Sequence, residues 1–418
     1  MMAAWARKAL FQTLQGLRDA HLTLVAPDGV LHSFGDAKSD LRATIRVHNE
    51  QFFVRAIFGG DDGAGDAFID GDWTTPDLVS VIRMAVRNLR QLEQGTRLQS
   101  WLSRTLNYAN HLRRRNTIDG SRKNIAAHYD LSNDFFRLFL DETMLYSSAI
   151  YPSGDASLEQ AQIEKIDRLC RKLRLAPGDR VLEIGTGWGA FALHAARRYG
   201  AHVTTTTISR QQHDLAQERF RAAGPDGRHI TLLLEDYRSL RGEFDKIVSI
   251  EMFEAVGFDY YDTFFGACDR LLSPDGVMAM QTITMNEFNF DRYRKSGDWI
   301  QRHIFPGGEL ASLRGIQDSL ARATRMGPTH LEDIGLHYAQ TLADWRVRFH
   351  QNVDRVRDLG FDEPFLRMWD YYLAYCEGAF RERYISAVQL VMAKAGTSRE
   401  LYGEPWQAEP FLAHRATA

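Results

Sequence analysis

The chain has 418 residues, of which 44% are hydrophobic and 25% are charged, and its formal net charge is −3. These values are typical of a globular protein, and the length favours two domains over a single core. A charge this close to zero gives no indication of a nucleic-acid partner. The cysteines are scattered without metal-ligand spacing, which argues against a metal site or a disulfide framework and favours a cytoplasmic location. No apolar run approaches the roughly 20 residues that are needed to span a bilayer.

The first 112 residues are predicted to form a small α+β domain. Ala43–Asn49 and Gln51–Phe58 alternate between apolar and polar residues as strands do, with a tight connection between them. Thr75–Asp77 contains a proline where a helix would begin, and the residues from Leu78 onward have helical spacing.

Residues 113–124 are polar and basic and contain a Gly-Ser pair, which predicts a linker. Two interpretations of the basic side chains stay open. They are solvated, as in most linkers, or they contact anionic lipid headgroups, where each would contribute about 1 kcal/mol. These side chains are Arg113, Arg114, Arg115, Arg122 and Lys123.

Residues 125–418 are predicted to form the catalytic domain, because helical and strand patterns alternate along them. Ser157 and Gln160 have the spacing of a capping box, which would begin a helix that runs to about Leu175. This alternation predicts an α/β fold with a doubly wound, Rossmann-like parallel sheet, in which ligands bind beyond the carboxyl ends of the strands. The predicted strands are residues 180–184, 202–208, 230–234, 246–250 and 276–281.

The stretch Val181–Ala190 predicts a buried strand, a glycine-rich turn and a helix. Gly185, Gly187 and Gly189 allow a sharp turn and a close approach to a ligand, and Glu183 lies two residues before the first glycine. The dinucleotide-binding fingerprint spaces its third glycine differently. This E-x-G-x-G-x-G pattern resembles the nucleotide-binding turn of class I methyltransferases. The resemblance implies that the chain binds S-adenosylmethionine (SAM).

Two further loops are candidates for the SAM site. Thr207, Ser209 and Gln212 offer hydroxyl and amide groups, where many SAM enzymes use an acid to bind the ribose. The alternative is that Ser209 and Gln212 only cap the next helix. Asp236 and Tyr237 suit an adenine, because a carboxylate accepts a hydrogen bond from its amine and an aromatic ring stacks on it. The alternative for this pair is an ordinary surface loop.

Segments on both sides of the glycine turn resemble the cyclopropane-fatty-acyl-phospholipid synthase family, which includes the mycolic acid cyclopropane synthases. The resemblance covers essentially all of residues 124–395, whereas the first 112 residues match the lipid-binding domain of the longer bacterial members only loosely. The segments that carry it are Asn124–Asp141, Met144–Tyr151, Val248–Gly257, Trp299–Gly308, His337–Trp345 and Tyr375–Arg381.

The resemblance implies a C-methyltransferase that adds a methyl group from SAM to the double bond of an unsaturated acyl chain in a phospholipid. Tyr146 and Ser147 would join the SAM site. Methyl transfer leaves a carbocation on the acyl chain, and loss of a proton from the new methyl group closes a cyclopropane ring. Such an enzyme would associate peripherally with the inner face of the membrane, and a homodimer is compatible with this expectation.

The reaction needs a base, which in the family is a bound bicarbonate ion held by a cysteine backbone, a glutamate, a histidine and a tyrosine. The matching positions here are Ser148, Glu254, Gln281 and Tyr338, with Ile283 supplying backbone. Ser148 stands where cysteine is common and Gln281 where histidine is common. A glutamine can still donate a hydrogen bond, but it cannot carry a proton or a charge.

These departures leave alternatives open. A weaker bicarbonate site would let the cation lose a different proton, which would give a methylene branch and, after reduction, a methyl branch. A non-catalytic lipid-binding protein that retains a SAM fold is a further alternative, which the intact glycine turn and Glu254 disfavour. Glu251 and Glu254 are spaced to share a helical face, and the match to the family segment favours Glu254 as the catalytic residue.

Overall fold

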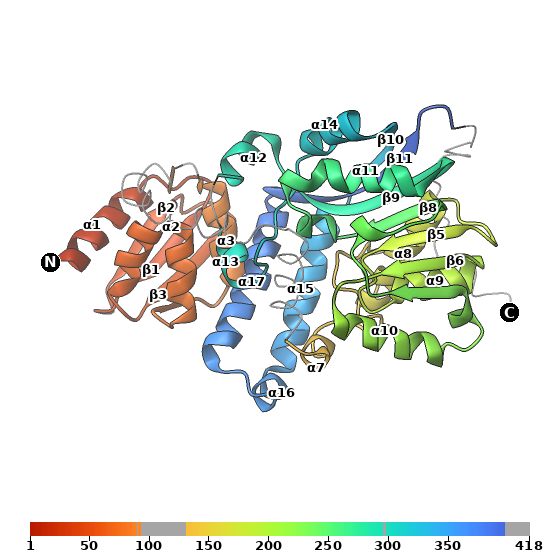
Figure 1. Cartoon of the computed structure of the whole chain (residues 1–418). Coiled ribbons are helices and arrows are strands. Elements are labelled where there is room, and N and C mark those ends of the chain that lie inside the picture. The colour runs from red at the N-terminus through yellow and green to blue at the C-terminus, as the bar shows by residue number, and fades with distance from the viewer. Residues whose placement is uncertain (90, 93–130, 296–297, 398–418) are drawn as a thin grey trace. The chain divides into compact units, whose positions relative to one another are not determined.

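A computed structural model of the chain describes residues 1–89, 91–92, 131–295 and 298–397 (Figure 1). The predicted linker and the first residues of the Asn124–Asp141 segment lie outside these ranges. The contacts within the chain divide it into two units. Unit 1 takes its described residues from 1–114, 291–306 and 342–385, and unit 2 takes them from 115–290, 307–341 and 386–418.

Unit 2 is built on a seven-stranded sheet, which confirms the predicted doubly wound, Rossmann-like fold (Figure 1). Neighbouring strands are parallel from β7 through β6, β5 and β8 to β9, and β10 pairs with β11 in the antiparallel sense. In spatial order the strands are β10 (Met326–Asp333), β11 (Ile385–Lys394), β9 (Leu272–Met285), β8 (Phe244–Ile250), β5 (Arg180–Ile184), β6 (His202–Thr206) and β7 (Ile230–Leu233).

Helices cover both faces of this sheet, because alternate side chains of the central strands are apolar on both sides. On β5, Leu182 and Ile184 belong to one core cluster, whereas Val181 belongs to the other. The first cluster includes side chains of α11 (Tyr261–Leu271) and α14 (Leu313–Ala323). The second includes side chains of α8 (Leu158–Lys172), α9 (Ala190–Tyr199) and α10 (Arg210–Ala222).

Local capping explains where the helices of unit 2 begin. Ser157 and Gln160 form the predicted capping box at the start of α8, which ends at Lys172, slightly before the predicted end. The Ser209 hydroxyl accepts a hydrogen bond from the Gln212 backbone N–H at the start of α10. Both helices therefore begin where the sequence predicts.

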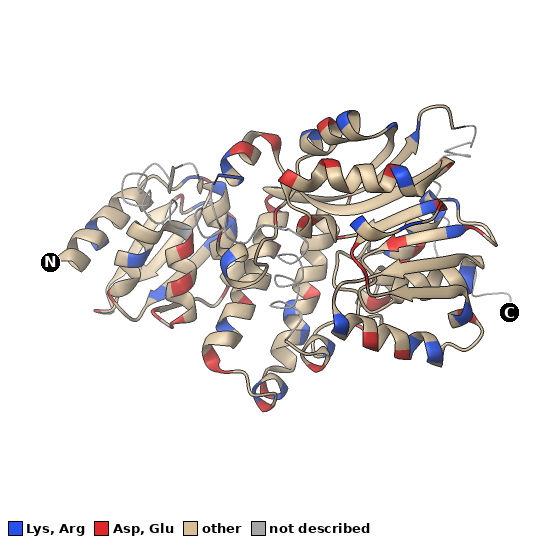
Figure 2. Cartoon of the chain, in the orientation of Figure 1, with Lys and Arg blue, Asp and Glu red and all other residues tan. Residues whose placement is uncertain are grey.

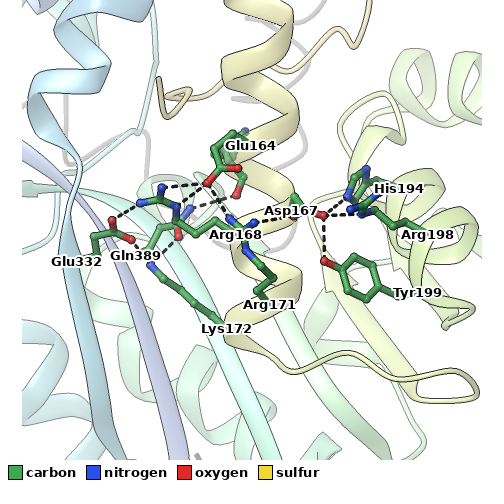
Figure 3. Close-up of polar contacts among 11 residues, drawn as sticks. Glu164, Asp167, Arg168, Arg171, Lys172, His194, Arg198, Tyr199, Glu332 and Gln389 are labelled. Atoms are coloured by element: carbon green, nitrogen blue, oxygen red, sulfur yellow. Dashed lines mark hydrogen bonds and ion pairs between the residues drawn. The ribbon is translucent and has the colours of Figure 1, made fainter. Parts of the chain in front are cut away.

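Helix α8 carries a row of polar residues that are buried against the rest of unit 2 (Figure 3). Asp167 is 1% exposed, and it accepts hydrogen bonds from His194 and Tyr199 and pairs with Arg171. These partners hold the pKa of Asp167 below its ordinary value although burial opposes this. Charged groups are otherwise found mostly on helices and loops, and the strands of the large sheet are largely uncharged (Figure 2).

Unit 1 contains a four-stranded sheet, in the order β2-β1-β3-β4, with helices that include α1 and α2. The predicted strand near residue 43 is confirmed as β3, and the predicted helix near residue 78 is confirmed as α3, which Asp77 caps. The bounds are α1 (Met2–Leu14), β1 (His21–Val25), β2 (Leu31–Gly35), β3 (Arg42–Val47), α2 (Gln51–Ile69), β4 (Trp73–Thr74) and α3 (Leu78–Arg87).

The strand predicted for Gln51–Phe58 is wrong, because these residues begin helix α2. Phe52, Phe53, Ala56 and Ile57 are buried, and this spacing gives one apolar face to a helix. The aromatic and branched residues of the segment suit a strand as well, and tertiary packing decides between the two.

Two later segments group with the N-terminal residues, although the sequence places them in the 125–418 domain. Helix α17 (Glu363–Arg381) packs so closely on α3 that a Cβ at Gly378 would lie 2.6 Å from the Ile82 side chain. Glu382 pairs with Arg83 and Arg87, at 2.6 Å each. The remaining helices of these segments are α13 (Trp299–His303), the later part of α15 (Gly335–Gln351) and α16 (Val353–Asp358).

Within the described ranges, no helix combines the length and the apolar character that crossing a membrane requires. In the same part of the chain, no group of His, Cys, Asp or Glu side chains is arranged to hold a metal ion.

Candidate active site

The glycine turn follows β5 and has the backbone shape that the sequence predicts. Gly185, Gly187 and Gly189 have φ values of 104°, 52° and 88°, which other residues rarely adopt. A Cβ at Gly189 would lie 2.5 Å from the Phe220 ring, whereas a Cβ at Gly187 would meet nothing within 4 Å. The turn is therefore closely packed behind Gly189 and open beside Gly187, which fits a ligand that approaches the backbone there.

Glu183 is 2% exposed and faces the neighbouring strand. Its carboxylate accepts a hydrogen bond from the Thr205 hydroxyl of β6 over 2.6 Å. Burial raises its pKa to about 8, and the nearby Lys165 cation opposes this. This hydrogen bond joins β5 to β6, so Glu183 stabilises the pair of strands from which the glycine turn begins.

The predicted ribose-binding residues form a compact group after β6. The Thr207 hydroxyl donates to Gln212 Oε1 over 2.9 Å and accepts from the Ser209 backbone N–H over 3.1 Å. Ser209 also caps α10. The structure therefore brings the three residues together, and the capping role that the sequence allowed for Ser209 is present.

The predicted adenine-binding pair follows β7, and both residues have partners. Each carboxylate oxygen of Asp236 accepts a hydrogen bond from the Arg238 guanidinium over 2.7 Å. Tyr237 is 9% exposed, and its ring meets Phe264 edge-on at a centroid distance of 5.3 Å. Neither residue lies in an ordinary surface loop, and their assignment to an adenine stays a prediction.

Tyr146 and Ser147 are held in place by contacts within unit 2. The Tyr146 ring packs against Phe136 at 5.3 Å, and Phe136 packs against Trp188 of the glycine turn at 5.2 Å. Ser147 accepts a hydrogen bond from Lys165 Nζ over 2.5 Å. The segment before α8 and the glycine turn are thus held to each other through side chains.

The group predicted to hold the base surrounds Glu251. Glu251 Oε1 accepts from the Ser148 backbone N–H and from Gln281 Nε2, both over 2.8 Å, and its Oε2 accepts from the Tyr338 hydroxyl over 2.7 Å. Glu251 is half-buried, and desolvation raises its pKa although these donors and Lys165 oppose it. Three of the residues predicted for the base site therefore converge on Glu251, whereas the sequence favours Glu254.

Glu254 lies beside this group but has other partners. Its Oε1 accepts from the Ile283 backbone N–H over 2.6 Å and from the Thr282 hydroxyl over 3.0 Å. Its Oε2 is buried and has no hydrogen-bond partner among the described residues. Burial and repulsion by Glu251 raise the pKa of Glu254 to about 8. The structure thus brings Glu254 and Ile283 together, whereas Ser148, Gln281 and Tyr338 donate to Glu251 instead of Glu254.

The Gln281 amide is oriented by a chain of hydrogen bonds that reaches helix α8, and Figure 3 shows Gln389 and Lys172 of this chain. Gln281 Oε1 accepts from Gln389 Nε2 over 2.9 Å, and Gln389 Oε1 accepts from Lys172 Nζ over 2.7 Å. Lys172 also pairs with Glu332 over 2.6 Å. Since Lys172 can only donate, each amide in the chain has one orientation that satisfies it, and Gln281 must present its N–H₂ to Glu251.

Comparisons with known proteins identify the family of the chain. A family model described as mycolic acid cyclopropane synthetase matches residues 116–390. The chain is 38% identical over 407 residues to a tuberculostearic acid methyltransferase of Mycobacterium tuberculosis, covering 94% of this chain and 92% of the relative. It is also 38% identical over 358 residues to the cyclopropane-fatty-acyl-phospholipid synthase of Escherichia coli, covering 84% and 88%.

A solved structure adds a three-dimensional match. A mycolic acid cyclopropane synthase complexed with SAH and CTAB superposes with a TM-score of 0.61 at 37% identity, covering 65% of this chain and 98% of that chain. SAH is what remains of SAM after methyl transfer, so the match supports SAM as the cofactor of this chain. The chain belongs to the mycolic acid cyclopropane synthetase family and is a SAM-dependent methyltransferase.

Proposed function

We propose that the chain transfers a methyl group from SAM to the double bond of an unsaturated acyl chain in a phospholipid and closes it to a cyclopropane. The observation that carries the proposal is the carboxylate pair, Glu251 and Glu254, after β8, with its donors from Ser148, Gln281 and Tyr338. Bound SAM supplies an electrophilic methyl group. The residues of the chain then have to hold the alkene beside it, exclude water and accept a proton.

In this proposal the glycine turn, Tyr146, Ser147 and the groups after β6 and β7 bind SAM. Gly187 allows close approach, because the space beside it is open. The alkene π electrons form the new C–C bond while the S–CH₃ bond breaks, which leaves a cation on the acyl chain. Ring closure then needs a base within reach of the new methyl group. The carboxylates after β8 are the candidates.

The proposed substrate, a phospholipid acyl chain, is supported by the name of the E. coli relative, which covers 84% of this chain. Because such a substrate lies in a bilayer, we place the enzyme at the inner face of the membrane as a peripheral protein.

A second product has its own support. The relative that covers 94% of the chain is named a tuberculostearic acid methyltransferase, and Ser148 and Gln281 depart from the cysteine and histidine pattern. If a hydride first shifts from the methyl-bearing carbon to the cation, loss of a methyl proton leaves an exocyclic methylene group. The two products differ only in this shift, so one base serves both.

The test is to incubate the purified protein with SAM and phosphatidyl-oleate vesicles and to examine the lipid by proton NMR. Mass cannot separate the products, because both add one carbon and two hydrogens. Upfield ring protons would support the cyclopropane, and olefinic methylene protons without ring protons would support the second product. A protein that binds SAM and changes no acyl chain would overturn the proposed lipid substrate.

A further inference from the structure

The donors around Glu251 bear on the identity of the base. We propose that the Glu251 carboxylate itself removes the proton that ends the reaction, at the position where the family resemblance places a bound bicarbonate ion. This inference rests on the proposed function, because it names the base for that reaction.

The Glu251 carboxylate fills the position where the three donors converge. Bicarbonate and a side-chain carboxylate are both planar anions that accept hydrogen bonds, and each binds where several donors converge. The Ser148 N–H, the Gln281 amide and the Tyr338 hydroxyl, which the resemblance assigns to bicarbonate, all donate to Glu251 within 2.8 Å. The donors present therefore fit a carboxylate that belongs to the chain, and they do not fit an additional bicarbonate ion.

The Gln281 amide has a fixed orientation. Its oxygen accepts from Gln389, whose own oxygen accepts from Lys172. Gln281 therefore presents N–H donors, to Glu251 and to the Ser148 carbonyl, over 2.8 and 3.1 Å. A group that is held as a donor by two further buried residues requires an acceptor opposite it, and Glu251 is that acceptor.

The backbone of Glu251 is strained. Glu251 has φ of 47°, in the left-handed region that residues with a Cβ adopt at a cost of about 1 kcal/mol or more. Strain of this kind persists where surrounding structure fixes it, often at functional sites. The strained backbone places the side chain among the three donors, and the residue as a whole is half-buried.

The proton transfer balances without another reactant. A Glu251 oxygen forms a bond to a hydrogen of the new methyl group, and the C–H electron pair becomes either the third ring bond or the methylene π bond. Glu251 becomes a neutral acid, and its proton leaves to water after the product departs. The buried Lys165 cation, which attracts Glu251, favours the ionised form before this step.

Two variants separate the possibilities. Glu251→Gln keeps the shape and removes the base. Glu251→Gly removes the side chain, suits the left-handed backbone and leaves the three donors facing open space. Bicarbonate binding is measured by titration calorimetry on SAM-loaded protein in buffers freed of dissolved carbonate. We expect binding to Glu251→Gly, and none to wild type or to Glu251→Gln, because both fill the position.

Turnover of phosphatidyl-oleate is measured in the same buffers. We expect wild type to work equally well without bicarbonate, and kcat of Glu251→Gln to fall at least 100-fold, as loss of a general base does, with unchanged SAM affinity. Glu251→Gly should lose as much and regain activity with added bicarbonate or formate. Formate is a carboxylate too small to reproduce other contacts of the side chain.

Each outcome bears on the inference. A bicarbonate requirement in wild type, bicarbonate binding to wild type, or Glu251→Gln turnover within tenfold of wild type would overturn it. If wild type changes no lipid although calorimetry gives the expected pattern, the proposed function fails. Glu251 then still stands as the occupant of the anion position.

Discussion

Gln389 Nε2 donates to Gln281 Oε1 over 2.9 Å, and this hydrogen bond joins the neighbouring strands β11 and β9. Gln389 is fully buried, and its hydrogen bond to Gln281 links it to Glu251. It is therefore a positioning residue, and its effect on the reaction can be tested separately from that of Glu251.

Replacing Gln389 with methionine keeps the length of the side chain and removes both the donor to Gln281 and the acceptor for Lys172. The Gln281 amide is then free to turn its oxygen towards Glu251, so we expect kcat to fall by about tenfold while SAM affinity stays unchanged. Asp167→Asn is the control, because Asp167 joins this polar network through Arg171, several contacts away from Gln389, and its replacement should lower thermal stability without turning Gln281. Equal kcat in Gln389→Met and wild type would contradict the positioning role.

The pH dependence follows from the pKa of Glu251, which burial raises above the ordinary value of 4.5. A carboxylate base works only when it is ionised, so turnover should rise with pH and be lost as pH falls through this raised pKa. Lys165, Glu254 and Tyr338 are the titratable groups that act on it.

Tyr338→Phe removes one donor to the ionised form. A hydrogen bond to a charged group contributes about 1.5–3 kcal/mol, so the acid limb of the kcat profile should move up by roughly one pH unit or more. The profile is measured on both proteins at saturating SAM. An acid limb that stays in place would mean that a group other than Glu251 controls it.

Glu254→Gln keeps an acceptor for the Ile283 N–H and removes a carboxyl whose pKa is raised to about 8. We expect turnover to be abolished or nearly so, because the paired carboxyl is lost beside Glu251, and SAM affinity to stay near wild type. Affinity is measured by calorimetry with SAM. A large loss of affinity would instead place Glu254 in the cofactor site.

Gly187 and Gly189 should respond differently to alanine. At Gly187 the methyl group enters open space, so SAM affinity should fall by about tenfold, or 1.4 kcal/mol, in a protein that still folds. At Gly189 it meets the Phe220 ring at 2.5 Å, so thermal stability should fall more. SAM binding by Gly187→Ala at wild-type strength would show that the cofactor lies elsewhere.

The sheet of unit 2 was predictable because its strands are apolar runs between turn and cap signals. The capping residues Ser157 and Ser209 also gave helix starts that the structure confirms. The prediction of a strand at Gln51–Phe58 is wrong because its apolar residues fit the period of a strand as well as that of a helix. The burial of Phe53 and Ile57 on one face favours the helix.

Glu251 could not be chosen over Glu254 from the sequence, since both follow β8 and the resemblance places the family's glutamate at Glu254. Its left-handed backbone depends on tertiary contacts, and its donors come from positions 103, 30 and 87 residues away. The bond between Gln389 and Gln281 depends on β11 lying beside β9, which follows from the strand order and not from any local pattern. The attraction of Lys165 on α8 for Glu251 and Glu183 is likewise a tertiary feature that no local pattern of the sequence shows.

Lys165 is fully buried, donates to Ser147, and attracts Glu251, Asp141 and Glu183, while burial lowers its pKa to about 8. One ammonium group thus sets the local potential both at the glycine turn and at the candidate base. A change in the charge of Lys165 would alter the electrostatic potential at both Glu251 and Glu183. In the proposed reaction, methyl donation and proton removal therefore share one counter-ion, and a redesign of the charge at one half of the site would alter the other.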